Sequence, residues 1–185
     1  MKEVDAYAVA AGPGSFTGVR VGLGTVKAWA EVYGKPTVAV SRLQALAMEA
    51  SGETALVAAF ANAQRGQVFG AVYERKGRGL VRLGEEMVIA PGKFVEAATE
   101  FAKGESISWV STDAECVVSE EAWKARKIRQ ERVECVSSAR APMIGRIGLT
   151  ELAEGRFTDA LALDANYVRR SDAEIFWKGR TTHGG

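Results

Sequence analysis

The first fifty residues alternate between continuous apolar runs and helical spacing. Residues 4–11 form a short, nearly continuous apolar run ending at a glycine turn, which is typical of a strand buried on both faces. Apolar positions over residues 16–33 recur at intervals of three and four, which predicts an amphipathic helix. A second strand over 36–40 and a second helix over 42–50 follow. This order predicts a doubly wound α/β fold with parallel strands.

The rest of the chain predicts short strands with tight turns, followed by helices. The predicted strands cover residues 54–61, 67–74, 80–89, 107–111 and 131–136, and the predicted helices cover 91–103, 120–127 and 141–154. No internal repeat or low-complexity linker divides the chain. We expect residues 1–52 to belong to a first α/β lobe, residues 53–170 to a second, and residues 171–185 to a partly ordered tail.

A glycine-rich turn joins the first predicted strand to the first predicted helix. Proline fixes φ and lacks an N–H, glycine permits left-handed or crowded backbone, and a serine or threonine can cap the helix. Helix-start N–H groups favour anions, so the turn suits phosphate; an equally weighted interpretation is that its glycines only make the turn. The motif residues are Gly12, Pro13, Gly14, Ser15, Phe16, Thr17 and Arg20.

The helix over residues 16–33 carries a second apolar stripe beside its core-facing one. The stripe begins with small residues and ends with large ones, and consists of Gly18, Gly22, Thr25, Trp29 and Val32. Glycine inside a helix lowers helix stability by about 1 kcal/mol relative to alanine, so glycines at these positions need an explanation. Close packing within the same chain is one explanation. A subunit interface over Gly18, Gly22, Thr25 and Trp29 is the other.

Composition and charge narrow the classes of function. The 24 Lys and Arg residues against 23 Asp and Glu give a net charge of +1, so the chain has no strong electrostatic attraction for nucleic acid or anionic membrane. No apolar run is long enough to span a bilayer, so we expect a cytoplasmic protein. Cys116 and Cys135 are far apart and are expected to be buried, reduced thiols.

Catalytic groups are scarce in this sequence. Its one histidine is His183, close to the C-terminus, which argues against a Ser-His-Asp triad or a two-histidine metal site. The neighbouring carboxylates Asp113 and Glu115, and likewise Glu85 and Glu86, are interpreted as solvated. We therefore expect no catalytic residue, no cofactor and no metal ion.

The glycine turn and several downstream segments resemble the TsaB family, also called YeaZ. The resemblance rests on residues 12–22, on the Val-Ser-Arg-Leu-Gln-Ala-Leu-Ala run over 40–47, on Ala-Gln-Arg-Gly-Gln-Val-Phe over 63–69, and on Ala-Asn-Tyr-Val-Arg-Arg over 165–170. Residues 80–140 match only loosely. Asn62 stands where the family usually has an acidic residue, and Gln64 replaces an arginine.

The resemblance implies an actin-like, sugar-kinase-like fold of two lobes. It also implies a non-catalytic subunit in the synthesis of threonylcarbamoyladenosine beside the tRNA anticodon, which pairs with the catalytic TsaD subunit and acts with the ATPase TsaE. A homodimer through a related surface is implied as well, and contact with tRNA only through the complex. The alternative is an ATP- or phosphate-binding enzyme of the same superfamily that uses the loop from Gly12 to Gly18.

The start of the chain departs from the family pattern. Family members carry a first β-hairpin and a first helix before the glycine turn, whereas eleven residues precede Gly12 here. We therefore expect a first lobe without these elements. An exposed apolar edge on the strand over residues 4–11 should result.

Overall fold

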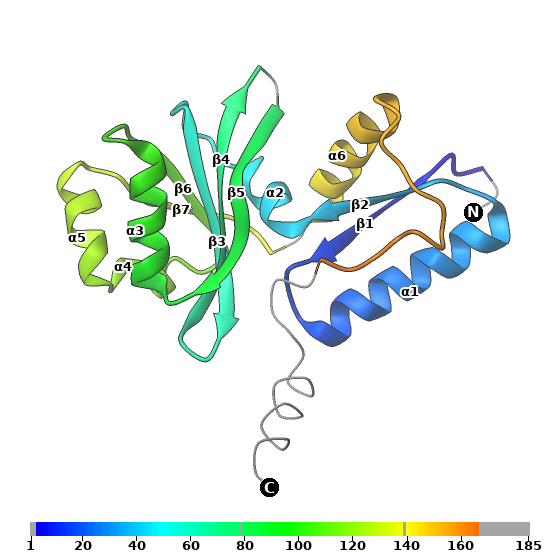
Figure 1. The fold of residues 1–185 in the computed structure, drawn as a ribbon, viewed down its shortest axis with the longest axis horizontal. Helices are drawn as coiled ribbons and strands as arrows, with labels where there is room; N and C mark the ends of the chain where they lie inside the picture. Colours follow the sequence, from blue (N-terminus) through cyan, green and yellow to red (C-terminus); the bar gives the residue numbers. More distant parts are fainter. Residues whose placement is uncertain (1–2, 78, 139, 167–185) are drawn as a thin grey trace, which may run out of the picture.

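Two parallel strands form the sheet of the first lobe. β1 (Tyr7–Gly12) pairs with β2 (Thr37–Ser41), and α1 (Phe16–Tyr33) connects them. The computed structural model describes residues 3–77, 79–138 and 140–166. In Figure 1, this lobe lies beside a larger one that contains a five-stranded sheet.

Helices cover both faces of the two-stranded sheet. Ser15 caps the start of α1, since its side chain accepts a hydrogen bond from the Gly18 N–H. Gly34 caps the end of the helix in a left-handed conformation with φ of 61°. On the other face lies α6 (Ala141–Ala153). A Cβ at Gly148 would lie 2.5 Å from the Cβ of Ala8, so glycine lets α6 approach the strands closely.

The second lobe is a mixed sheet with helices on both faces. Its strand order is β5-β4-β3-β6-β7, antiparallel from β5 to β3 and parallel from β3 to β7. Figure 1 shows α3, α4 and α5 together on the side away from the first lobe, and α2 between the sheet and the first lobe. The bounds are α2 (Arg42–Ala47), β3 (Leu56–Gln64), β4 (Gln67–Lys76), β5 (Gly79–Ile89), α3 (Pro91–Ala102), β6 (Ile107–Ser111), α4 (Glu115–Val118), α5 (Glu121–Ile128) and β7 (Val133–Cys135).

Aromatic rings fill the core between this sheet and its outer helices. Phe94 of α3 lies 5.8 Å from Phe60 and 6.1 Å from Trp109, measured between ring centroids, and Trp109 lies 5.1 Å from Trp123. All four side chains are buried. A side chain at Gly70 would overlap the Phe94 ring, so this glycine makes room for the aromatic core.

One ion pair is buried beside that core. The Arg126 guanidinium donates to both oxygens of Glu131, at 2.7 Å from Nε and 2.5 Å from Nη2. Glu131 also accepts from the indole Nε1 of Trp109 at 2.7 Å and from the Ile107 N–H at 3.2 Å. Because these bonds satisfy both carboxylate oxygens, the pair locks α5 onto β6.

The predicted elements are present in the predicted order, with one addition and two changes of place. α2, expected in the first lobe, packs on β3 and β4 of the second, with Leu43, Leu46 and Ala47 in the core of that lobe. The four-residue helix α4 is not among the predicted elements. Residues 141–166, expected in the second lobe, instead pack against the first, because α6 contacts β1 and β2 and Thr158 pairs with Thr37. The expected tail over 171–185 lies outside the described residues. Within the described part of the chain, no helix has the length and apolar character needed to cross a membrane.

Candidate functional site

Side-chain and backbone atoms from other parts of the chain contact the glycine turn, residues 12–15. Arg42 Nη1 donates to the Pro13 carbonyl at 3.2 Å, and a Cβ at Gly14 would lie 2.5 Å from that nitrogen. Gly12 has φ of 112°, and a Cβ there would lie 2.8 Å from the Asn166 carbonyl oxygen. Backbone conformation and close packing thus account for Gly12, which supports the structural interpretation of the turn, whereas at Gly14 only the end of the flexible Arg42 side chain lies close.

The inner face of α1 packs on the first sheet, as the sequence predicts. Val19, Leu23, Val26 and Ala30 are all buried. They form one cluster with residues of β1 and with Ala160 and Leu163 from the segment after α6. Hydrophobic burial therefore fixes the rotation of α1 on the sheet and decides which side faces outward.

The second stripe lies on the outer side of α1 and is mostly uncovered. Gly18 and Thr25 are exposed, Trp29 is 42% exposed and Val32 is 74% exposed, whereas Gly22 is half-buried. Nearby on this side, Val21 is 62% exposed. The outer face of α1, as the term is used below, consists of six residues: Gly18, Val21, Gly22, Thr25, Trp29 and Val32. Close packing within the same chain accounts for part of the stripe, since a Cβ at Gly22 would lie 3.8 Å from the Val9 side chain of β1, but no helix of the described residues packs closely over Gly18.

Two contacts order the side chains of this outer face. The Trp29 ring lies 5.9 Å from the ring of Tyr7 on β1, measured between centroids. The Thr25 hydroxyl donates to the Val21 carbonyl at 2.8 Å. The face is thus an apolar surface whose Trp29 ring is held in place.

Glu86 is a buried carboxylate that the sequence interpretation missed. The pair Glu85 and Glu86 was expected to be solvated, and Glu85 is 90% exposed, but the side chain of Glu86 is 2% exposed. Gly84 has φ of 70°, and the register of β4 with β5 shifts between Gly70 and Val72. This irregularity in β5 turns Glu86 inward, and a glycine next to two acidic residues within a strand pattern was the available signal.

The polar groups near the ends of β3 and β6 form a small hydrogen-bonded cluster. Asp113 Oδ2 accepts from Asn62 Nδ2 and from the Cys116 thiol, each at 3.1 Å. The hydrogen bonds from Cys116 and Asn62 lower the pKa of Asp113. Burial first, and the hydrogen bond to Asp113 second, raise the pKa of Cys116 to about 11. Cys116 is therefore a poor nucleophile at neutral pH. Cys116 is half-buried and Cys135 is exposed, contrary to the expected burial of both thiols.

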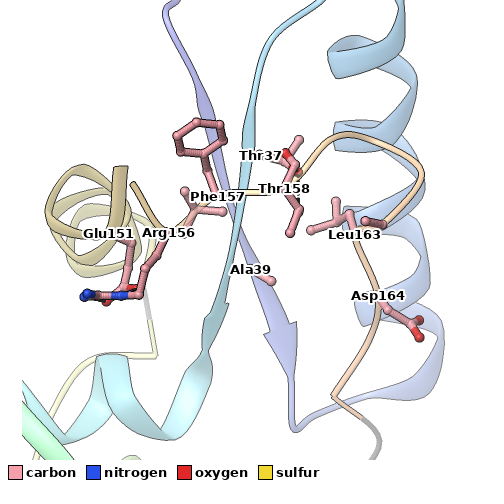
Figure 2. A pocket seen from close by; sticks show the side chains of 10 residues that line it. Thr37, Ala39, Glu151, Arg156, Phe157, Thr158, Leu163 and Asp164 are labelled. Carbon is pink, nitrogen blue, oxygen red and sulfur yellow. Dashed lines mark hydrogen bonds and ion pairs between the residues drawn. The ribbon is translucent and has the colours of Figure 1, made fainter. Parts of the chain in front are cut away.

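A shallow pocket of about 320 Å³ lies at the outer edge of β2 (Figure 2). Thr37 borders it, and both its backbone and its hydroxyl are bonded to Thr158. The Arg156 guanidinium at its rim is held by Glu151, at 2.5 Å from Nε, and by Glu154. Two carboxylates already balance this arginine, so it is a poor anchor for an anionic ligand.

Metal ligands do not gather in the described residues. Residues 3–77, 79–138 and 140–166 hold no group of three or more His, Cys, Asp or Glu side chains arranged to bind an ion. His183 lies outside the described residues.

Comparison with known proteins assigns the family. A family model described as TsaD, tRNA N6-adenosine threonylcarbamoyltransferase, matches residues 1–139. The chain belongs to this family. Its likeness to TsaB and YeaZ proteins within the family confirms the resemblance seen in the sequence. TsaB of Escherichia coli K12 is 32% identical over 114 residues, which cover 60% of this chain and 48% of that protein.

Two further matches agree with a TsaB/YeaZ-type member of the TsaD family. TsaB of Bacillus subtilis 168 is 37% identical over 75 residues, which cover 40% of this chain and 33% of that protein. A solved Pseudomonas aeruginosa protein, described as similar to peptidase YeaZ, is 25% identical with a TM-score of 0.68, over 91% of this chain and 75% of that one. These likenesses confirm the expected actin-like fold. The chain spans about half the length, or less, of the curated TsaB relatives it matches.

Proposed function

We propose that this TsaB/YeaZ-type chain is a non-catalytic subunit of the machinery that makes threonylcarbamoyladenosine in tRNA. In this proposal it pairs with the catalytic TsaD subunit through the outer face of α1 and acts with the ATPase TsaE in the cytoplasm. It contacts tRNA only through the complex. A homodimer through the same face is the state that competes with the TsaD pairing.

The observation that carries the proposal is the uncovered outer face of α1. Val21, Trp29 and Val32 present apolar surface there, and Gly18 leaves the helix backbone open to close approach, whereas Gly22 is half-buried beside Val9. Small residues let two helices pack with their axes near each other, while the large residues at the ends supply buried apolar area. A helix from a partner subunit fits such a face better than a small ligand does.

The contacts of the glycine turn weigh against the phosphate-binding alternative. The Asn166 carbonyl lies on Gly12, so the chain's own backbone takes the position beside the start of the turn. Titration of the chain with ATP and magnesium separates the two functions. We expect no saturable micromolar binding and no turnover. Saturable binding together with ATP turnover would favour the enzyme.

Reconstitution tests the proposed function itself. Purified TsaD, TsaE, threonylcarbamoyl-adenylate, ATP and unmodified tRNA from the same organism should give threonylcarbamoyladenosine only when this chain is added. A mixture that works equally well without the chain would overturn the proposal. Formation of the product by this chain alone would overturn its non-catalytic role.

A further inference from the structure

The buried carboxylate of Glu86 joins three segments that are far apart in the sequence. Its Oε1 accepts from the Ser41 hydroxyl at 2.5 Å, and its Oε2 accepts from Asn166 Nδ2 at 2.7 Å. Arg82 of the same strand lies at the edge of this group, with Nη1 3.6 Å from Oε1. Glu86 belongs to the second lobe, whereas Ser41 ends β2 of the first. The carboxylate therefore bridges the two lobes.

Asn166 extends this bridge to the glycine turn. Its backbone N–H donates to the Ala11 carbonyl at 2.8 Å, and its carbonyl lies on Gly12. Asn166 thus holds Glu86 with its side chain and β1 with its backbone. Residues 164–166, called the strap below, cover the turn where β1 ends and from which α1 starts.

Ser41 links the Glu86 carboxylate to the first turn of α2. Its hydroxyl oxygen accepts from the N–H groups of Leu43 at 3.1 Å and Gln44 at 3.2 Å, while its proton is directed to Glu86. The serine therefore caps α2 and anchors the lobe junction at once. The buried Tyr73 side chain faces this group, and burial, followed by the charge of Glu86, raises its pKa.

We propose that Glu86 is a clasp that closes the strap over the glycine turn and holds the two lobes in a fixed relative orientation. Breaking the clasp lifts residues 164–166 from Gly12 and uncovers the turn, while the core of each lobe stays folded. The device lies at the lobe junction and not on the outer face of α1. It can be tested on the isolated chain and does not depend on the proposed function.

Hydrogen exchange of the strap tests this clasp. Replacing Glu86 by Ala removes the acceptor for Asn166, and the loss of a hydrogen bond to a buried charge should speed exchange in the peptide covering residues 160–166 by about tenfold or more. Glu85→Gln is the matched control, since it changes the neighbouring, exposed carboxylate. We expect no change in that control, and none in the β3 amides of either variant.

A second variant keeps the test sharp if Glu86→Ala folds poorly. Asn166→Asp keeps the size of the side chain but places a second carboxylate against Glu86, with Arg82 as the nearby cation and Tyr73 as the other titratable group facing it. Its strap should exchange faster at pH 7, and the difference from the parent should shrink when acid protonates one carboxylate. Unchanged strap exchange in both variants, or equal acceleration of the β3 amides, would overturn the clasp.

Discussion

The two lobes differ in how completely their helices cover apolar surface. In the second lobe, α2 covers one face of the sheet and α3, α4 and α5 the other, and its four core rings are buried. In the first lobe, α1 covers the sheet with one side and presents apolar side chains outward with the other. The second lobe leaves only separate apolar side chains such as Phe101 and Ile128 exposed in its described residues. The first lobe leaves one side of α1 uncovered, and this is the surface proposed to bind another protein.

The largest effect should follow from opening the aromatic core of the second lobe. Phe94→Ala removes a buried ring that contacts Phe60 and Trp109, and should lower the free energy of unfolding by about 3–5 kcal/mol. Urea denaturation followed by tryptophan fluorescence measures this. Phe101→Ala, in the same helix but 39% exposed, should cost about 1 kcal/mol or less. Equal losses in both variants would contradict the ring packing described for this lobe.

The next largest effect concerns the buried ion pair of the second lobe. Glu131→Gln leaves the Arg126 guanidinium buried without a full counter-charge and should cost about 3 kcal/mol in the same urea experiment. The exposed pair of Glu121 and Lys124 is the control, and Glu121→Gln should cost at most about 0.5 kcal/mol. A small loss for Glu131→Gln would mean that Arg126 reaches solvent.

The two cysteines of the second lobe should differ in reactivity, because Cys116 is half-buried and Cys135 is exposed. Cys116 has its pKa raised to about 11, so at pH 8 only about one thiol in a thousand is ionised. Cys135 is exposed. Iodoacetamide at pH 8 should therefore label Cys135 well before Cys116, and labelling of Cys116 should accelerate as the pH approaches 11. Mass spectrometry of the labelled peptides checks this, and equal rates at pH 8 would contradict it.

The smallest effect separates glycines that the fold needs from those that it does not. A Cβ at Gly24 would meet no atom within 4 Å, so Gly24→Ala should stabilise the chain by about 0.5–1 kcal/mol through helix propensity. Gly148→Ala should destabilise it, because the new Cβ would overlap Ala8. Thermal unfolding of both variants is the measurement. Destabilisation by Gly24→Ala would show that an unseen neighbour occupies that side of α1.

Most of the fold could be predicted from the sequence because local signals agree with packing. Ser15 and Gly34 mark the ends of α1, and its apolar spacing identifies the buried side. The four-residue α4 was missed since it is too short for a periodic pattern. The packing of residues 141–166 on the first lobe could not be predicted, because it depends on long-range contacts such as Thr37 with Thr158.

The candidate site shows a similar division between local and long-range information. The outer side of α1 follows from helical spacing, and Gly18, Thr25 and Trp29 of the stripe are exposed while Gly22 is half-buried; that this stripe is a subunit interface stays a prediction. The burial of Glu86 was not foreseen. Its side chain turns inward at an irregularity of β5, and its partners, Ser41 and Asn166, are 45 and 80 residues away in the sequence.

Binding to TsaD tests the central claim most directly. Calorimetric titration of TsaD from the same organism should give saturable binding with the parent chain. Gly18→Leu places a bulky side chain on the outer face and should weaken binding at least tenfold, whereas Gly24→Leu, on the polar side of the same helix, should leave the dissociation constant unchanged. Unaltered binding of Gly18→Leu, with both variants folded, would contradict the assignment of this face to the partner.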